Sequence, residues 1–266
     1  MVRVNFILLF LLFAAAGSAI AQNLGIHPTT LEFRLSGGQT ESQVVHLSNG
    51  SDKKVQFRLY LNDWYRDTVG GHAYFRPDTL PQSCSKWVTL DKTFVEVEPG
   101  KSADVNVKLQ LPEDPNATKE MKWSMLFIET VEEQSAAAAK GAQAAVRNLL
   151  RMGVHIYQTP PTVTGKQIKV YDLTQVPNEH NAYQVLCQNT GKVMVECSSY
   201  IELASLADGK KTKLAPVEYP LFPAQRRYVR FTISSDLPKG KYSALAVVDA
   251  GEDVSLEAVE STIEIK

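Results

Sequence analysis

The sequence lacks the residue patterns on which metal and redox sites depend. Its cysteines form no CxxC pair, and its histidines form no HxH or HExxH pair. A metal ion needs several convergent ligands, and a thioredoxin-type site needs two closely spaced cysteines. The five histidines are scattered at His27, His46, His72, His155 and His180. We therefore expect no metal and no cofactor.

Motifs of common enzyme classes are also missing. The chain has no GxSxG, GxGxxG or GxxxxGK[ST] segment. Adjacent acidic residues such as Glu132 and Glu133 stand in polar, loop-like surroundings, which favours solvated carboxylates over acid–base catalysis. The sequence therefore predicts no catalytic residues and no enzyme. A serine hydrolase built from residues far apart in the chain stays open, because such a site leaves no local motif.

The chain has little excess charge of either sign. It carries 28 lysines and arginines against 29 aspartates and glutamates, a net charge of -1. Proteins that bind nucleic acids usually show a basic surplus. We therefore expect no nucleic-acid partner.

A long hydrophobic run occurs only at the start of the sequence. Arg3 precedes the apolar segment NFILLFLLFAAAG, and the small residues of AIA follow it. This order is typical of a secretory signal peptide at residues 1–21, cleaved before Gln22. An uncleaved anchor is the alternative, although the run is short for a bilayer span of roughly 20 residues. We expect no membrane insertion after the signal is removed.

The cysteines are few and odd in number. Cys187 and Cys197 flank the turn QNTGK, whereas Cys84 stands apart. A Cys187–Cys197 disulfide and three buried thiols that act as small apolar residues both fit this spacing.

Strand patterns dominate the rest of the chain. In ADVNVKLQL the apolar residues Val105, Val107 and Leu109 alternate with polar ones, which indicates an antiparallel strand with one solvated face. Similar runs are bounded by Gly, Pro, Asn or Ser, as in SQVVHLSN and TFVEVEPG. The expected fold class is all-β.

The second half of the chain repeats the pattern of the first. Residues 44–61, VVHLSNGSDKKVQFRLYL, correspond to residues 183–203, YQVLCQNTGKVMVECSSYIEL. VEPGKSADVNVKLQLP likewise matches LFPAQRRYVRFTISSDLP, and KWSMLFIET matches KYSALAVVD. Segments that match in the same order predict two tandem immunoglobulin-like β-sandwiches. We place the boundary at QTPPTVTG, which gives domains at residues 22–159 and 160–266.

The three tryptophans leave two interpretations open. Trp64, Trp87 and Trp123 all stand at strand-like positions of the first half. Core packing is the usual role of such side chains, and a sugar-binding platform is the alternative. A secreted carbohydrate-binding or hydrolytic protein is thus one rival function.

The order of these features resembles the PapD-like periplasmic pilus chaperones of Gram-negative bacteria. The resemblance is carried by GIHPTTLEFRLSGGQTESQVVHLSNGS, KWVTLDKTFVEVEPGKSADVNV, MKWSMLFIETV and VHIYQTPP. It implies two immunoglobulin-like domains in a boomerang and a location in the periplasm. It also implies a client, a pilin-like subunit that lacks its last strand, and an outer-membrane usher as assembly platform. In this family the last strand of the first domain completes the client's sheet.

Transferred to this sequence, the resemblance assigns a donor strand at residues 146–157. It follows a strand at residues 119–131 and an alanine-rich loop. The expected client-binding side chains are Val146, Leu150, Met152 and Val154 on one face of the donor strand.

The resemblance also implies a carboxylate anchor in the cleft between the domains. Family members use an Arg and a Lys there, where this sequence has Thr30 and His155. Either Arg34 or Arg151 replaces the missing cation, or the protein does not bind a carboxylate in the manner of the family. A structural or adaptor module of a cell-envelope complex is the other rival, with the same sandwiches but no released client.

Overall fold

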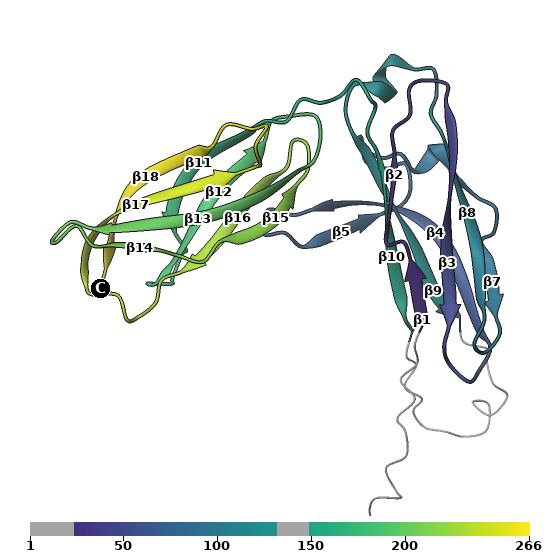
Figure 1. Cartoon of the computed structure of the whole chain (residues 1–266), viewed down its shortest axis with the longest axis horizontal. Coiled ribbons are helices and arrows are strands. Elements are labelled where there is room, and N and C mark those ends of the chain that lie inside the picture. Colours follow the sequence, from purple (N-terminus) through teal and green to yellow (C-terminus); the bar gives the residue numbers. More distant parts are fainter. Residues whose placement is uncertain (1–23, 132–148) are drawn as a thin grey trace, which may run out of the picture.

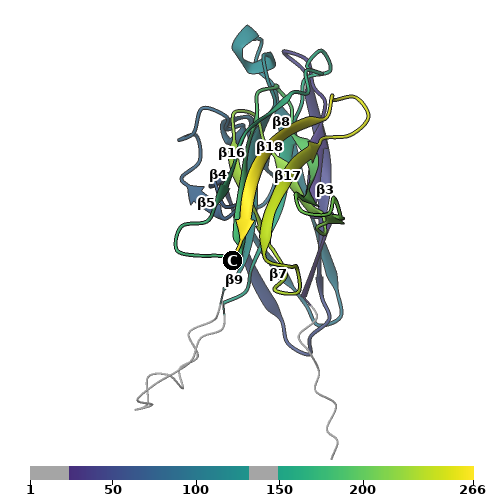
Figure 2. The ribbon, with the colours of Figure 1, turned by 90° about the vertical axis from the view of Figure 1, so that its left-hand side faces the viewer.

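The computed structural model describes residues 24–131 and 149–266 and shows two β-sandwiches that meet at an angle (Figure 1; Figure 2). The all-β, two-sandwich, boomerang-like architecture expected from the sequence is confirmed. The expected signal peptide and Val146 lie outside the described residues. Within the described part of the chain, no helix is long and apolar enough to cross a membrane.

The N-terminal sandwich has two sheets. The first contains, in spatial order, β1 (Leu24–His27), β3 (Thr40–Asn49), β8 (Ser102–Gln110) and β6 (Val88–Leu90). The second contains β2 (Thr30–Phe33), β10 (Arg151–Gln158), β9 (Lys122–Val131), β4 (Val55–Arg66) and β5 (His72–Phe75), with β7 (Phe94–Val97) also paired to β4. Short 3-10 turns lie at Ser85–Trp87 and Pro115–Thr118.

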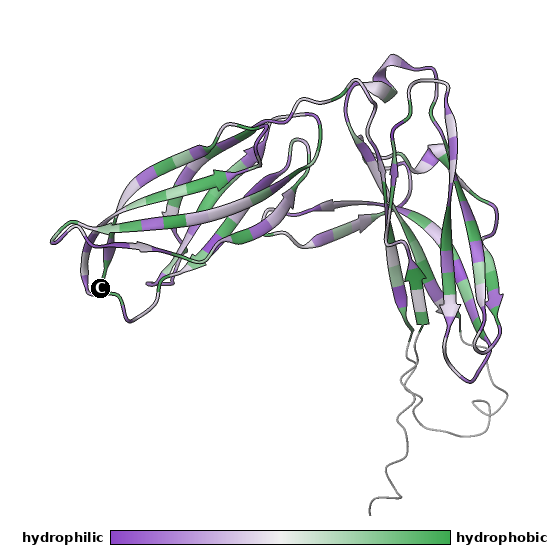
Figure 3. Ribbon diagram, viewed as in Figure 1, coloured by the Kyte–Doolittle hydropathy of each residue, from purple (hydrophilic) through white to green (hydrophobic). Residues whose placement is uncertain are grey.

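Alternation along the strands builds the N-terminal core. Hydrophobic and hydrophilic residues alternate along β8 (Figure 3). Val105, Val107 and Leu109 are fully buried, whereas their polar neighbours face solvent. Apolar side chains from both sheets meet on the inside, and their removal from water is the main stabilising term.

The C-terminal sandwich follows the same plan. One sheet contains β11 (Ile168–Gln175), β12 (Ala182–Asn189) and β16 (Arg226–Thr232). The other contains β14 (Lys211–Lys213), β13 (Val195–Ser205), β17 (Gly240–Asp249) and β18 (Glu257–Ile265), with β15 (Val217–Leu221) paired to β13. Its core is separate from the N-terminal one, and the two cores lie on either side of the expected boundary at residues 159 and 160.

All three cysteines are buried and free. The structure therefore has thiols, not a disulfide, at Cys187 and Cys197. Burial raises the pKa of the Cys84 thiol to about 12 and also raises the pKa of Cys187.

A buried asparagine at the equivalent turn of each domain supports the internal repeat. Asn49 Nδ2 donates to Lys53 O at 2.7 Å and to Val97 O at 2.9 Å. Asn189 Nδ2 donates to Val193 O at 2.8 Å and to Leu221 O at 2.7 Å. Each side chain thus satisfies carbonyls that its turn buries, as buried polar groups require.

A small aromatic core joins the two domains. Phe222 of the C-terminal domain packs on Trp64 and Trp123, with ring centroids 5.0 Å apart in both pairs. Both tryptophans are buried in this cluster, so the packing interpretation holds for them. The β4–β5 hairpin extends from the N-terminal sandwich toward β15 (Figure 1), and Tyr228 N donates to Thr68 O at 2.7 Å.

Candidate functional site

β10 has an edge that is only half paired. It pairs antiparallel with β9 along its whole length, from Arg151 to Gln158. On the other side it pairs with β2 only from His155 onward, in the parallel register His155↔Thr30. Among the described residues no strand pairs with this side of residues 151–154. Such an edge is a template for strand addition.

The direction of the backbone groups defines this open edge. Thr130 N donates to Leu150 O at 2.9 Å, so the carbonyl of Leu150 faces β9. His155 N donates to Thr29 O at 3.0 Å, so the backbone of His155 faces β2. Because backbone groups alternate in direction along a strand, Arg151 and Gly153 present theirs to the open edge.

The apolar row on the core face of β10 becomes more exposed toward its start. Ile156 and Val154 are fully buried, Met152 is half-buried against the N-terminal core, and Leu150 is 43% exposed. The hydrophobic core therefore covers β10 less and less before the residue at which pairing with β2 begins. Val154 was expected to contact a client, but its side chain is 0% exposed and fills its own core. The partly exposed apolar surface at the start of β10 is formed by Met152 and by Leu150, the residue before Arg151.

The opposite sheet also ends in a free edge next to half-buried apolar residues. β1 pairs with β3 and, in the described ranges, with no other strand. Its Leu24 and Ile26 are half-buried and pack against the same core as Met152. The chain crosses from one sheet to the other at Pro28 and Thr29, which leaves both sheets incomplete on this side of the sandwich.

On the outer face of β10, Arg151 packs against two aromatic rings. The Arg151 guanidinium lies 4.5 Å from the ring centroid of Phe127 and 5.6 Å from that of Tyr74. Gly153 follows it on the same face, and a Cβ there would lie 2.8 Å from Met125 Sδ. Cation–π contacts of this kind hold an exposed arginine against the sheet.

Only two of the four expected anchor residues come together. Thr30 and His155 are register partners on adjacent strands. Arg34 and Arg151 each stand four residues from that pair in opposite directions, about 13 Å along the strands. Neither arginine therefore replaces the missing cation beside His155.

His155 is enclosed by aromatic rings. Its ring centroid lies 5.0 Å from that of Trp64, 5.7 Å from Tyr157 and 6.1 Å from His72. Burial, with smaller contributions from His72 and from the nearby charge of Arg66, lowers the pKa of His155 to about 4. The ring is neutral at pH 7 and supplies no cation. The nearby cation is Arg66, which the sequence did not single out.

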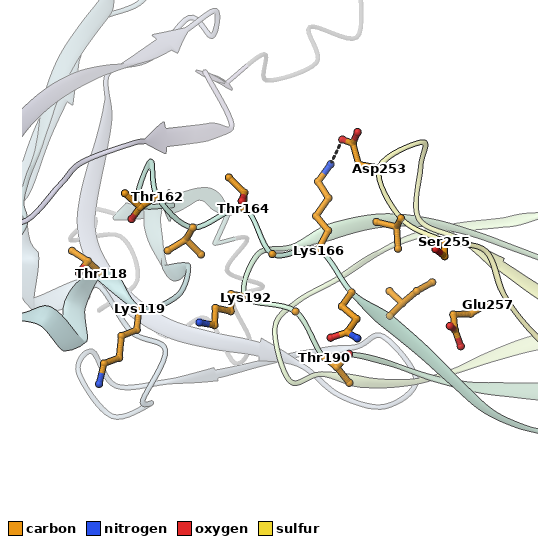
Figure 4. A pocket seen from close by; sticks show the side chains of 16 residues that line it. Thr118, Lys119, Thr162, Thr164, Lys166, Thr190, Lys192, Asp253, Ser255 and Glu257 are labelled. Atoms are coloured by element: carbon orange, nitrogen blue, oxygen red, sulfur yellow. Dashed lines mark hydrogen bonds and ion pairs between the residues drawn. The ribbon is translucent and has the colours of Figure 1, made fainter.

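A cavity lies at the interdomain linker (Figure 4). It has a volume of about 760 Å³, and Lys166 on its rim forms an ion pair of 3.3 Å with Asp253. Its lining is polar and open, and within the described ranges no group of three metal-ligating side chains occurs here or elsewhere. This cavity therefore offers no chemistry comparable to the open edge of β10.

Comparison by sequence identifies no relative: no family model matches the chain, and no curated protein matches it. The fold has clear counterparts among solved structures. A chain of the chaperone–tip adhesin complex of CFA/I fimbriae biogenesis matches with a TM-score of 0.51 and 12% identity, over 90% of this chain and 98% of that chain.

Two further structures match at lower TM-scores. The class 5 fimbriae chaperone CfaA matches with a TM-score of 0.48 and 11% identity, over 90% of this chain and 98% of that one. The CupB2 chaperone of Pseudomonas aeruginosa matches with a TM-score of 0.45 and 14% identity, over 91% and 100%. At these identities the likeness concerns the fold. The chain therefore has the two-domain β-sandwich fold of the PapD-like fimbrial chaperones.

Proposed function

We propose that this protein is a non-enzymatic periplasmic chaperone that caps a surface-fibre subunit by lending it the edge of β10. The observation that carries the proposal is the coincidence of two features on one short stretch, residues 150–154. The backbone of residues 151–154 is unpaired on one side, and the apolar row beside it emerges from the core at Met152 and Leu150.

The two features fit the needs of a subunit that lacks a strand. Such a subunit has an apolar groove and a row of unpaired backbone groups, and both are costly to expose. Strand addition at β10 pairs the backbone groups through Arg151 and Gly153. Leu150 and Met152 enter the groove at the same time. Because both are already partly covered, burial of each contributes only a fraction of the roughly 1.5–3 kcal/mol that full burial of an exposed side chain provides.

Val146 and the anchor residues complete this proposal. Val146 lies outside the described residues, and we propose from its even spacing to Leu150 in the sequence that it also contacts the client. Thr30 and His155 contact the end of the client strand where β2 begins to pair, each through a neutral hydrogen bond. Arg151, released from Phe127 and Tyr74, provides a surface cation next to the added strand.

Complex formation during assembly tests this function against that of an adaptor. The protein is co-expressed with a surface-fibre subunit, and both the soluble periplasmic fraction and the assembled fibre are analysed. A chaperone forms a soluble one-to-one complex with the subunit and is absent from the finished fibre. Presence of the protein in the finished fibre would instead establish an adaptor.

A further inference from the structure

The buried polar side-chain atoms that lack a hydrogen-bond partner are all concentrated in one place. Across residues 24–131 and 149–266 there are five such atoms: Trp64 Nε1, Arg66 Nε, His155 Nε2, Arg227 Nε and Arg227 Nη1. Native proteins satisfy nearly all buried polar groups, so a cluster of unsatisfied ones needs an explanation.

These atoms come from neighbouring side chains where the two domains meet. The rings of Trp64 and His155 lie 5.0 Å apart, and the Arg66 guanidinium lies 5.9 Å from the Trp64 ring. Arg227 reaches the same region from β16 of the C-terminal domain. Burial, and after it the charge of Arg227, lowers the pKa of Arg66.

Gly70 brings the two arginines together. Arg66 Nη1 donates to Gly70 O at 3.2 Å. A Cβ on Gly70 would lie 2.3 Å from Arg227 Nη1, so only glycine leaves room for that guanidinium. Gly70 also has a φ of 95°, which side-chain-bearing residues rarely adopt. The turn of the β4–β5 hairpin is thus shaped to receive a cation from the other domain.

Neither arginine of this pair is neutralised by direct contact with a carboxylate in the described residues, although the charge of Glu196 acts on Arg66 and Arg227 lies 4.8 Å from the centroid of the Tyr219 ring. No carboxylate forms an ion pair with Arg66 or Arg227, although other arginines such as Arg58 and Arg230 each have a glutamate partner. Arginine and the tryptophan indole offer only donors and no acceptor. Two neighbouring half-buried charges of the same sign repel each other, and a bound anion with several acceptor oxygens would offset both the repulsion and the unmet donors.

We propose that Arg66 and Arg227 form an oxyanion site that bridges the two domains. The ligand is a group with at least two acceptor oxygens and a negative charge, such as a carboxylate or a phosphate, which arginine holds in paired hydrogen bonds. The bound group links the β4–β5 hairpin of one domain to β16 of the other and so stabilises the domain arrangement. The evidence for this site is the placement of Arg66 and Arg227 where the two domains meet, and it does not depend on strand donation.

Thermal unfolding of the purified protein in defined anions tests the site. Sodium phosphate and sodium acetate are each compared with sodium chloride at equal ionic strength, so that screening is the same in all samples. At about five times its Kd, a bound anion raises Tm by about 2–4 °C. Stabilisation by both salts identifies a general oxyanion site, and stabilisation by one alone identifies the carboxylate or the phosphate as its ligand.

Matched variants show whether the shift comes from this pair. Arg66→Gln and Arg227→Gln each remove the anion-dependent shift, whereas Arg226→Gln, the neighbouring arginine on β16, keeps it. Gly70→Ala removes it without changing either arginine, because the added Cβ displaces Arg227. In chloride, the Arg66→Gln/Arg227→Gln protein is at least as stable as the unchanged protein, since the repulsion is gone. The absence of any shift above chloride, or an equal shift in that double variant, would overturn the proposal.

Discussion

His155 shows how the surroundings of a single residue decide what it can do. Alignment with the family pattern placed Thr30 and His155 at the two anchor positions, and in the structure these residues are register partners. What the sequence did not reveal is that Trp64, His72 and Tyr157 enclose the ring. Tyr157 is two residues away on the same strand, but Trp64 and His72 are distant in the sequence, and their convergence on His155 depends on how β4, β5 and β10 align. Arg66 and Arg227 were missed for the same reason, since they belong to different domains.

The lowered pKa of His155 predicts that stability falls at mildly acidic pH. Its pKa drops from 6.5 to about 4 on folding, so between these values the unfolded chain binds a proton that the folded chain does not. Stability is therefore complete above pH 6.5 and declines as the pH falls toward 4, by at most about 1.4 kcal/mol per unit. His72, whose pKa is also lowered, contributes in the same direction.

Urea unfolding between pH 7.5 and 4.5 measures this effect. The His155→Gln protein lacks the titrating group and is expected to lose less stability over this range than the unchanged protein. Equal pH dependence of the two proteins would show that His155 is not held neutral by the fold.

Two adjacent leucines allow a test of the client-binding face at the residue scale. Leu149 is 56% exposed and Leu150 is 43% exposed. Because consecutive side chains of an extended chain alternate, the two leucines point to opposite faces of it. Leu150→Glu places a carboxylate in an apolar groove, which is expected to weaken subunit binding by on the order of 100-fold or more. Leu149→Glu is the matched control and leaves binding within a few fold. Affinity is measured by titration with a purified subunit, and equal loss in both variants would refute a specific face.

At the scale of elements, the sequence predicted which segments form strands better than it predicted the residues at which the strands begin and end. Alternation in residues 104–111 predicted β8 and its buried face, and the repeated turns predicted the equivalent positions of Asn49 and Asn189. The donor strand was expected at residues 146–157, whereas β10 is Arg151–Gln158. The pattern defined which residues share a face of β10, but not that the N-terminal core covers Val154. That depends on how the two sheets pack.

The repeated turns differ at one position in a way that predicts a stabilising change. Gly100 and Ala224 occupy equivalent places, with φ values of 67° and 62°, and their N–H groups donate to Asn49 O and Asn189 O. An alanine in this conformation costs about 1–2 kcal/mol, and glycine loses about 0.5–1 kcal/mol of chain entropy. Ala224→Gly is therefore expected to stabilise the protein by about 0.5–1 kcal/mol in urea unfolding. Gly100→Ala is the reciprocal variant and is expected to destabilise it, and a destabilised Ala224→Gly protein would contradict this reasoning.

At the scale of the whole molecule, the two sandwiches are held together by a shared aromatic cluster and by hydrogen bonds from the β4–β5 hairpin and from Met121 N to Lys192 O. The sequence predicted two domains from the repeat but not this junction. Phe222 and Trp64 look like ordinary core residues until both domains are in place. The junction lies on the outer face of the β10 sheet, and in the described part of the chain no strand of the second domain pairs with the open edge of residues 151–154.

The most direct test of strand donation is amide hydrogen exchange in the free protein and in its complex with a fibre subunit. The amides of Arg151 and Gly153 face the open edge, so they are expected to exchange rapidly in the free protein and to become at least tenfold more protected in the complex. The amides of Met152 and Val154 face β9 and are expected to be protected in both states. Unchanged exchange at Arg151 and Gly153 in a complex of proven stoichiometry would contradict the account.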